Sequence, residues 1–351
     1  MEIFELIEQH EHEQVVFCYE PAAGYRGIIA IHNSTLGPAL GGTRLWNYAT
    51  DQEAVVDVLR LARGMTYKAA VAGLNLGGGK AVIIGDPKVK RREMLFRAHG
   101  RFVETLKGRY ITAEDVGTSV EDMDYVHMET EYVTGLAGRS GDPSPVTAYG
   151  TYRGIKAGAK HRYGSDDLNG VSVAVQGVGH VGYYLCQDLA AEGAKLIVTD
   201  IDDERVKRVV DEFGAQAVAS DDIYSVDAQV FAPCALGAVV NDETLRKFKF
   251  EIIAGAANNQ LEEEHHGKEL ADRGILYAPD YVINAGGLIN VYGELNGWTS
   301  ERSKRKAGEI YDTLDQLFEL AREEGLPTNE AADRLAERRI QQVGAIQHTW
   351  L

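Results

Sequence analysis

Apolar and β-branched runs alternate with segments of helical periodicity along the first third of the chain. In residues 51–67 the apolar side chains recur at three- and four-residue spacing and acidic residues stand at the start, which predicts an amphipathic helix. The shorter runs have the length and composition of strands. The pattern predicts one α/β unit, with strands over 14–19, 26–32, 41–46, 80–84 and 110–113 and helices over 51–67 and 91–106.

The alternation is interrupted at residues 135–145, GLAGRSGDPSP, where glycine, serine and proline are concentrated. This composition is typical of a linker, so we place the boundary between two domains there, at 1–134 and 135–328. Beyond it, strands and helices alternate at a spacing that predicts a parallel sheet covered on both faces. The predicted strands are 171–176 and 195–200, the helices are 180–192 and 204–213, and further apolar runs lie at 228–232, 251–254 and 275–277. Residues 300–324 and 329–347 have a helical pattern, and the last segment, about 329–351, is expected to pack back onto the first domain.

Length and composition limit the classes of function. A chain of 351 residues exceeds what one hydrophobic core usually supports, so we expect two α/β domains separated by a deep cleft. The 36 basic and 53 acidic residues give a net charge of −17, which argues against nucleic acid and anionic membranes as partners. No run approaches the roughly 20 apolar residues of a membrane span. The three cysteines are few and scattered, as expected of a cytoplasmic protein.

The paired histidines His10 and His12 lie among glutamates near the N-terminus. Such a pair could hold a metal ion, but a solvated helix end is the simpler interpretation. We therefore expect no metal site.

A glycine motif directly follows the strand predicted at 171–176. It reads Gly177-Val178-Gly179-His180-Val181-Gly182 and opens a helical segment. In a dinucleotide-binding loop the first glycine allows a tight turn, the second allows the pyrophosphate to approach, and the third allows the helix to pack on the strand. Asp200, 23 residues after Gly177 and at the end of the next predicted strand, can accept hydrogen bonds from ribose hydroxyls and would repel a 2′-phosphate. The motif predicts a Rossmann-type NAD-binding domain, with a structural glycine turn that binds nothing as the alternative.

A second candidate site centres on Lys80, which three glycines precede in LGGGKA. The glycines would remove side-chain bulk around the cation just before a strand. A phosphate-binding Walker A loop is excluded, because Leu74 and Ala81 stand where that motif needs glycine and Ser or Thr. Lys68, after the predicted helix, and Asp115, after the strand at 110–113, could converge on Lys80. Burial and a second ammonium would lower the pKa of Lys80 towards that of a general base, while Lys68 could bind a substrate carboxylate. Each residue alone is better explained as a surface lysine or a capping aspartate, and only the three together favour a site.

Eight runs in collinear order resemble the Glu/Leu/Phe/Val amino-acid dehydrogenase family, and its leucine-specific members most closely. The runs are GPALGGTR (37–44), ARGMTYK (62–68), GLNLGGGKAVIIGDP (73–87), YITAEDVGT (110–118), AVQGVGHVG (174–182), APCALGAVVND (232–242), GAANNQL (255–261) and YAPDYVINAGGLINV (277–291). The resemblance spans nearly the whole chain.

The resemblance implies reversible oxidative deamination of an L-amino acid to a 2-oxo acid and ammonia, with NAD taking the α-hydride. At matching positions Lys68 would bind the substrate carboxylate, Lys80 would activate the water that attacks the imine, and Asp115 would shuttle protons at the amino group. Thr147 and Asn259 would fix the nicotinamide and the substrate, and domain closure would exclude water. The resemblance also places a cofactor contact at Ala235 and substrate contacts at Gly41, Gly42 and Met65.

Four further positions, Leu40, Ala113, Leu288 and Val291, would line the pocket for the substrate side chain. Ala113 and the run LNLGGGK match the enzymes for aliphatic substrates, whereas Leu288 and the run NVYGEL (290–295) depart from the leucine type. We expect leucine, with valine and isoleucine, and keep phenylalanine or tryptophan as the alternative. A non-catalytic NAD- or metabolite-binding protein is the alternative from another class. The resemblance further implies a homo-oligomer, an octamer if the leucine type holds, with the N-terminal strands and the C-terminal helical segment as candidate interfaces.

Overall fold

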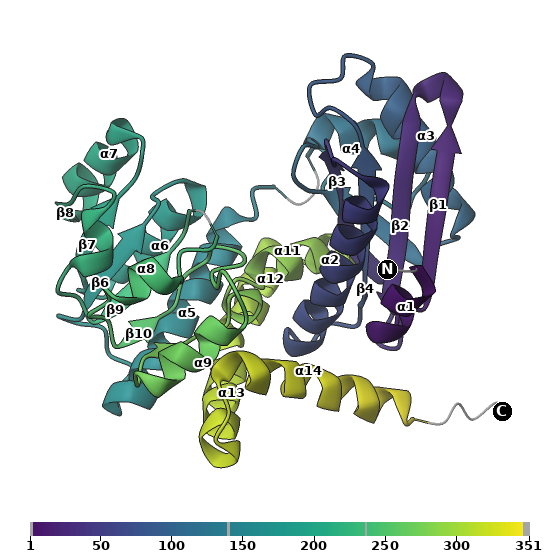
Figure 1. Cartoon of the computed structure of the whole chain (residues 1–351). Helices are drawn as coiled ribbons and strands as arrows, with labels where there is room; N and C mark the ends of the chain where they lie inside the picture. The colour runs from purple at the N-terminus through teal and green to yellow at the C-terminus, as the bar shows by residue number, and fades with distance from the viewer. Residues whose placement is uncertain (1–2, 139–140, 236, 347–351) are drawn as a thin grey trace. The chain divides into compact units, whose positions relative to one another are not determined.

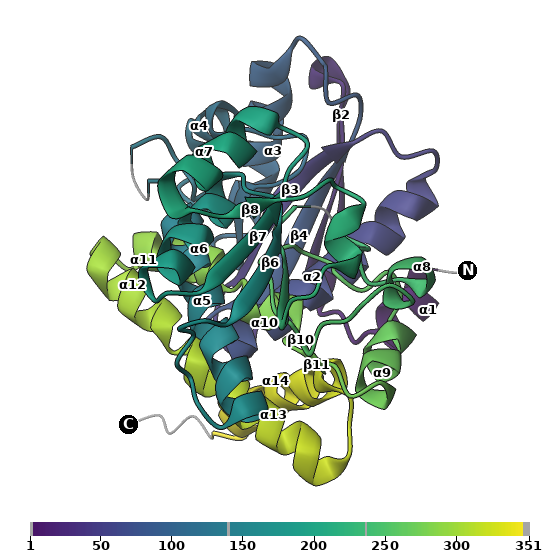
Figure 2. The same cartoon turned by 90° about the vertical axis from the view of Figure 1, so that its left-hand side faces the viewer.

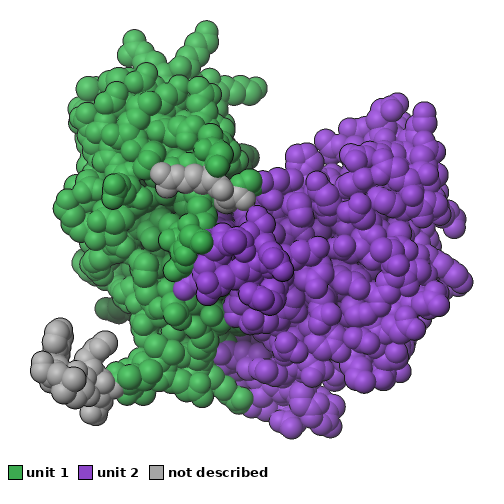
Figure 3. All heavy atoms as spheres, turned by 180° about the vertical axis from the view of Figure 1, so that it is seen from behind, with its two compact units in different colours: residues 1–141, 294–297, 336–351 green, residues 142–293, 298–335 purple. Residues whose placement is uncertain are grey.

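The chain forms two compact units (Figure 3). The computed structural model describes residues 3–138, 141–235 and 237–346. Unit 1 comprises residues 1–141, 294–297 and 336–351, and unit 2 comprises residues 142–293 and 298–335. The division after Gly141 falls inside the segment 135–145 that the composition marked as a linker. Parts of three segments named above lie outside the described residues. They are residues 139–140 of the predicted linker, residue 236 of the run 232–242, and residues 347–351 of the C-terminal segment.

Unit 1 is built on a five-stranded mixed sheet in the order β1-β2-β4-β3-β5. β1 and β4 run antiparallel to β2, whereas β3 runs parallel to both β4 and β5. Each of the five strands predicted for the first domain is present. Their bounds are β1 Gln14–Glu20, β2 Tyr25–Asn33, β3 Ala39–Trp46, β4 Gly77–Ile84 and β5 Tyr110–Glu114.

Helices cover both faces of this sheet (Figure 1). The helices α1 (Ile3–Gln9) and α2 (Asp51–Val71) pack on one face, where Ile28 of β2 contributes to the core. The helices α3 (Arg92–Thr105) and α4 (Val120–His127) pack on the other, where the neighbouring Ile29 points. Successive residues of a strand point to opposite faces, so β2 serves both cores. The sequence predicted α2 and α3 but not the short α1 and α4, and α2 extends beyond its predicted end to Val71.

The three glycines before Lys80 lie inside β4 rather than before a strand, and they meet the neighbouring elements. A Cβ atom on Gly78 would fall 2.1 Å from the backbone nitrogen of Thr66 in α2. One on Gly79 would fall 2.8 Å from the ring of Tyr110 in β5. The glycines therefore allow α2 and the other strands to approach β4 closely, and their role is not confined to the space around the lysine.

The N-terminal histidine pair differs from its prediction. His12 is only 6% exposed, and its Nε2 atom pairs with the carbonyl of Leu59 in α2 at 2.9 Å. Its ring packs edge-on against His32, with the centroids 4.8 Å apart, and burial lowers its pKa. The expectation of a solvated helix end is wrong for His12, which is a buried contact between the N-terminal segment and α2.

The described residues of unit 2 form a sheet of six strands, all parallel, in the order β8-β7-β6-β9-β10-β11. Numbered along the unit, this is the order 3-2-1-4-5-6 of dinucleotide-binding folds. Figure 2 shows this sheet, with β6 and β7 near the middle of the view. The prediction of a parallel sheet is confirmed. The strands are β6 Ser172–Gln176, β7 Lys195–Thr199, β8 Gln216–Ala217, β9 Val230–Pro233, β10 Ile252–Ile253 and β11 Leu276–Tyr277.

The longest helix of unit 2, α5 (Ser144–Tyr163), begins inside the predicted linker and was missed. Its glycines lie four residues apart on one face of the helix, where neighbouring helices pack closely against it. A Cβ atom on Gly150 would lie 2.6 Å from Ile310, and one on Gly154 would lie 2.5 Å from Ile283. Glycine has a low helix propensity, so this segment does not look helical in the sequence. In the structure, close packing of the neighbouring helices requires glycine at these positions.

The remaining helices surround the unit 2 sheet or follow it in sequence. They are α6 His180–Ala191, α7 Asp203–Phe213, α8 Asp242–Leu245, α9 His265–Asp272, α10 Asp280–Ile283, α11 Gly286–Leu295, α12 Ser300–Gly308, α13 Ile310–Glu324 and α14 Thr328–Gly344. The second half of α14 belongs to unit 1, where Glu337 accepts a hydrogen bond from Tyr67 at 2.9 Å and Arg339 donates to the carbonyl of Leu74 at 2.8 Å. Among the described residues, no helix has both the length and the apolarity to cross a membrane.

The packing of α2 on β4 leads to a test with two glycines. Gly78→Ala is expected to destabilise unit 1 by about 1–3 kcal/mol, because the new methyl group meets helix backbone that cannot move aside. Gly64→Ala is the matched control: it lies within α2, its Cβ position is open, and alanine there should stabilise the helix by about 1 kcal/mol. Denaturant unfolding followed by circular dichroism measures both. Equal stability of the two variants would contradict the role assigned to Gly78.

Candidate functional site

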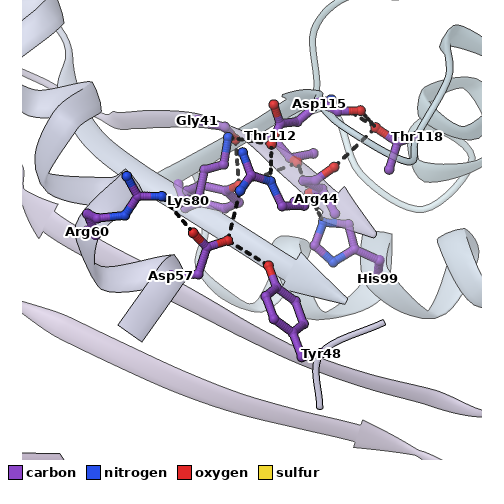
Figure 4. A network of polar contacts seen from close by, with 12 residues as sticks. Gly41, Arg44, Tyr48, Asp57, Arg60, Lys80, His99, Thr112, Asp115 and Thr118 are labelled. Carbon is purple, nitrogen blue, oxygen red and sulfur yellow. Dashed lines mark hydrogen bonds and ion pairs between the residues drawn. The ribbon is translucent and has the colours of Figure 1, made fainter. Parts of the chain in front are cut away.

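The structure brings Lys80 and Asp115 into direct contact. The Nζ atom of Lys80 lies 2.8 Å from Oδ2 of Asp115, and the two side chains are 7% and 22% exposed (Figure 4). Burial lowers the pKa of Lys80, although Asp115 opposes the shift. Burial raises the pKa of Asp115, but the cations Lys80 and Arg44 outweigh it and hold the pKa below its ordinary value. Lys80 and Asp115 thus form an ion pair in which the lysine is buried and the carboxylate is mostly shielded from solvent.

Strand register explains why these residues meet. Leu40 of β3 pairs with Gly78 of β4 and with Ile111 of β5. Every second residue of a strand shares a face, so Gly42 follows Leu40 and Lys80 follows Gly78 on the face that α2 covers. In β5 the same face continues from Ile111 through Ala113 towards Asp115. Three strands thus place Leu40, Gly42, Lys80 and Ala113 side by side.

The glycines Gly41 and Gly42 of β3 provide the room for this arrangement. A Cβ atom on Gly41 would lie 1.7 Å from the carbonyl oxygen of Gly79. One on Gly42 would lie 2.4 Å from the carbonyl oxygen of Glu114 and 2.9 Å from Cβ of Asp115. Side chains at these two positions would push β4 and the Asp115 loop away, so both glycines are structural requirements of the site.

Arg44 is a member of the site that sequence reasoning missed. Its Nε atom donates to Oδ2 of Asp115 at 3.1 Å and its Nη1 atom to Oδ2 of Asp57 at 2.9 Å. Asp57, on α2, also accepts hydrogen bonds from Tyr48 at 2.7 Å and from Arg60 at 3.0 Å. The available signal was the position of Arg44 at the end of the run GPALGGTR, two residues beyond Gly42.

Two further side chains, Thr118 and His99, form hydrogen bonds that hold the loop at Asp115 and the strand β3 in place. The Asp115 N–H donates to the Thr118 hydroxyl at 2.8 Å, and that hydroxyl lies 3.1 Å from the carbonyl of Thr43. On the opposite face of β3, the Thr43 hydroxyl pairs with Nε2 of His99 at 2.7 Å. Burial lowers the pKa of His99 to about 3, so the ring is neutral and serves as a fixed hydrogen-bonding partner.

The other site residues predicted for unit 1 lie on the same elements. Lys68 is partly exposed in the last turn of α2, two residues after the Thr66 that packs on Gly78, and not after the helix as predicted. Met65, one turn earlier, is also partly exposed. Arg44, which the sequence did not single out, contributes to the lowered pKa of Lys80.

In unit 2 each glycine of the motif meets the constraint expected of a dinucleotide-binding loop. Gly177 has φ +91°, and a Cβ atom there would lie 2.6 Å from that of Ala235 after β9. A Cβ atom on Gly182 would lie 2.0 Å from the carbonyl oxygen of Gly177. Gly179 caps α6 without a side-chain hydrogen bond, so backbone N–H groups are left for a phosphate. Val178 is buried, Val181 partly exposed and His180 exposed.

Asp200 lies directly after β7 and connects to this loop. Its Oδ2 atom accepts the N–H of Val178 at 2.8 Å, and its Oδ1 atom accepts the N–H of Asp202 at 3.0 Å. A carboxylate oxygen can accept more than one hydrogen bond, so both atoms can still receive ribose hydroxyls. Loop and carboxylate together fit NAD.

The remaining predicted residues of unit 2 fall into two places. Thr147, in the first turn of α5, adjoins Gly286 and Gly287 at the start of α11, the helix that carries Leu288 and Val291. Leu288 is 6% exposed and Val291 is partly exposed. Asn259, with φ +50°, accepts the N–H of Ala238 on its carbonyl at 2.7 Å, in the loop that follows β10.

Four potential metal ligands also meet in unit 2, apart from the predicted sites. The ligand atoms of Asp242, His265, His266 and Glu269 lie within 4.8 Å of one another. His266 Nδ1 accepts the N–H of Glu263 at 3.1 Å, so its ring proton points from Nε2 towards Asp242. Glu269 bonds Arg273. These hydrogen bonds engage three of the four potential ligands, namely His266, Asp242 and Glu269.

Models of known families match most of the chain. The dimerisation domain of the Glu/Leu/Phe/Val dehydrogenases matches residues 12–132, and the Glutamate/Leucine/Phenylalanine/Valine dehydrogenase model matches residues 197–346. A leucine dehydrogenase from Thermoactinomyces intermedius is 58% identical over 100% of this chain and 97% of its own length. The chain belongs to the Glu/Leu/Phe/Val dehydrogenase family. The leucine dehydrogenase of Bacillus subtilis (strain 168) is likewise 58% identical, over 98% of this chain and 95% of its own. The crystal structure of L-tryptophan dehydrogenase from Nostoc punctiforme is similar with a TM-score of 0.90 and 48% identity, over 97% of this chain and 99% of that one.

Membership of the Glu/Leu/Phe/Val dehydrogenase family confirms the resemblance drawn from the eight runs and the two-domain α/β fold class. The leucine dehydrogenases match this chain at higher identity than the tryptophan enzyme does. The resemblance to the leucine-specific members is thus confirmed as well.

Asp200 generates a prediction about cofactor choice. Asp200→Asn should weaken NAD use about 10- to 100-fold, since hydrogen bonds to a charged group contribute about 1.5–3 kcal/mol, and should narrow the preference for NAD over NADP. The measurement is kcat/KM with each dinucleotide at saturating amino acid. Asp203→Asn is the matched control, because Asp203 is exposed three residues further on. A wild-type chain that used NADP better than NAD would refute the role given to this carboxylate.

Proposed function

We propose that this member of the Glu/Leu/Phe/Val dehydrogenase family catalyses the NAD-dependent, reversible oxidative deamination of branched-chain L-amino acids, with leucine preferred and valine and isoleucine accepted. The observation that carries the proposal is the buried contact of 2.8 Å between Lys80 and Asp115. It occurs in a chain that is 58% identical to leucine dehydrogenases over its full length. Unit 1 binds the amino acid and unit 2 binds NAD.

The side chains of unit 1 supply the acid and base chemistry. Lys68 binds the substrate carboxylate as a cation at the end of α2. Because burial lowers the pKa of Lys80, its amine gives up a proton more readily than that of a surface lysine, and it activates the water that attacks the imine. Asp115, in hydrogen-bonding contact with Lys80, takes and returns the proton of the substrate amino group. The low exposure of both groups strengthens each of these interactions.

Unit 2 orients the cofactor. The loop Gly177–Gly182 offers backbone N–H groups to the pyrophosphate, and Asp200 receives the ribose hydroxyls. Ala235, Thr147 and Asn259 complete the contacts to the cofactor. When bound, NAD accepts the hydride from the α-carbon of the substrate. Gly179 keeps the approach to the α6 N-terminus open, since Arg205 Nη1, at 3.6 Å, is the nearest of the atoms that a Cβ atom there would meet.

The pocket for the side chain is apolar. Leu40 and Ala113 share the sheet face of Lys80, and neither carries charge that would favour an acidic substrate. Gly41, Gly42 and Met65 are the other proposed substrate contacts of unit 1. Leu288 and Val291, on α11, are the substrate contacts proposed for unit 2. A pocket of this kind separates substrates that differ by one methylene by only about 1–3 kcal/mol, so valine and isoleucine remain substrates.

A panel of L-amino acids tests the function. NADH formation at alkaline pH is expected to be fastest with leucine, slower with valine and isoleucine, and slowest with phenylalanine and tryptophan. A preference for an aromatic substrate would replace the leucine assignment with a phenylalanine or tryptophan dehydrogenase.

Lys80→Ala belongs to the same experiment. It should lower kcat about 10²- to 10⁴-fold without loss of NAD binding, since it removes a general base and leaves unit 2 unchanged. Lys107→Ala is the control, because that lysine is 74% exposed and pairs with Glu104. NAD binding without turnover of any amino acid by the unaltered chain would favour the non-catalytic alternative.

We further propose that the chain assembles as a homo-oligomer in the cytoplasm, where free cysteines such as Cys18, Cys186 and Cys234 stay reduced. β1 is an edge strand, and its Phe17 and Tyr19 are 55% and 68% exposed. An unpaired edge with apolar side chains is suited to pairing with a second copy.

The resemblance to leucine-type enzymes leads us to expect an octamer of about 307 kDa, eight times the 38.4 kDa of one chain. Light scattering coupled to gel filtration measures the mass. Phe17→Glu should yield smaller species, whereas Met128→Glu, at a residue 61% exposed elsewhere in unit 1, should not. A monomeric wild-type chain would contradict the assembly, and a smaller oligomer would contradict the octamer.

A further inference from the structure

Arg44 links the Lys80–Asp115 pair to helix α2. It extends from β3 on the same face as Lys80, and its side chain is 20% exposed. One end of the guanidinium contacts Asp115 and the other contacts Asp57, at 3.1 Å and 2.9 Å (Figure 4). Its role in the proposed reaction is open, because Lys68, Lys80 and Asp115 already account for the substrate, the water and the proton.

The geometry at Asp115 is specific. Both cations, Lys80 and Arg44, contact the same carboxylate oxygen, Oδ2. With Oδ2 held from two directions, the carboxylate has one orientation, and neither cation occupies Oδ1. Oδ1 contacts neither cation, and it is the oxygen that we expect a substrate amino group to approach.

Asp57 fixes Arg44 in its turn. Its Oδ2 atom accepts from Arg44 and from the Tyr48 hydroxyl, while its Oδ1 atom accepts from Arg60. A carboxylate with three donors is held firmly, and the planar guanidinium that bridges two carboxylates cannot rotate without breaking one contact. A lysine at position 44 would carry the charge but could not span both partners with fixed geometry.

We propose that Arg44 is a positioning residue of the deamination site, which holds the Asp115 carboxylate in its working orientation and is itself held by Asp57. The inference rests on the proposed function for the role of Asp115. It concerns how the proton-shuttling group is oriented, which Lys80 alone does not determine.

Arg44 also acts on the charges of the pair. Its cation lowers the pKa of Asp115 and lowers the pKa of Lys80, in both cases as a contribution smaller than burial. Asp57 acts on Lys80 in the opposite sense and raises its pKa. The charged and titratable groups that face Arg44 are Asp115 from the loop after β5, Asp57 from α2 and Tyr48 from the segment after β3, and those that face Lys80 are Asp115, Arg44 and Asp57.

The test compares Arg44→Gln with the wild-type chain. Loss of the bridge should lower kcat about 10- to 100-fold, as expected when a reacting group is misplaced by about 1 Å. The pH profile of kcat, governed by the coupled ionisation of Lys80 and Asp115, should move to higher pH because Arg44 lowers both pKa values. Arg26→Gln is the matched control: Arg26 forms an exposed ion pair with Asp51 in the same unit, and its loss should move neither kcat nor the profile.

Two further variants separate charge from geometry. Arg44→Lys retains the cation and should keep the wild-type pH profile while it recovers only part of kcat. Asp57→Asn retains Arg44 but removes an anion that raises the pKa of Lys80, so the profile should move to lower pH. If Arg44→Gln does not fold, these two variants decide the question.

A second readout does not depend on turnover. The pH at which Lys80 is half-maximally acetylated by trace acetic anhydride, followed by peptide mass spectrometry, reports the ionisation of its amine. It should rise in Arg44→Gln and stay unchanged in Arg26→Gln. Wild-type kcat in Arg44→Gln, or a reduced kcat with both the pH profile and the acetylation midpoint unmoved, would overturn the positioning role. If the wild-type chain deaminates no amino acid, the proposed function fails, whereas the acetylation midpoint still shows whether Arg44 controls the pair.

Discussion

The burial of Lys80 is the constraint on which the site in unit 1 depends. An ammonium group that is 7% exposed is stable only beside an anion, because an uncompensated buried charge is strongly unfavourable. Asp115 supplies that anion at 2.8 Å and is itself shielded from water. Arg44 and Asp57 extend the pair into a chain of alternating charges that ends at the surface with Arg60. Each charge has a neighbour of opposite sign, and the least exposed member, Lys80, is the proposed general base.

Close backbone packing makes this chain of charges geometrically possible. Gly41 and Gly42 of β3 allow β4 and the Asp115 loop to approach, and Gly78 allows α2 to pack on β4. The same approach brings Asp57 of α2 within reach of Arg44. The glycines, which carry no chemistry, therefore set the distances at which the charged groups act.

In the proposed function the two units bind their ligands by different physical means. Unit 1 uses side chains whose protonation is adjusted by burial and by neighbouring charges. Unit 2 uses backbone N–H groups at the start of α6 and one carboxylate that also holds the loop, as the hydrogen bond from Val178 to Asp200 shows. Backbone groups do not titrate, so the cofactor site is defined by its shape, whereas the site in unit 1 is defined by its charges.

The sequence by itself determined most of the local helices and strands, and it identified candidate functional residues by their type and spacing. Apolar periodicity predicted the five strands of the first sheet, and the glycine spacing with Asp200 predicted the cofactor loop, because both depend on contacts within short segments. Tertiary structure alone decided what depends on contacts between distant segments. Helix α5, whose first residues fall in the predicted linker, was not predicted, and its glycines are explained by the helices that pack on them. His12 was expected to be solvated, but α2 covers it. Arg44 and Asp57, 13 residues apart, became partners only when β3 paired with β4 and α2 packed on one face of that sheet. Pairing between distant charged side chains leaves no periodic signal in a sequence, and therefore Arg44 and its partner Asp57 emerged only from the folded chain.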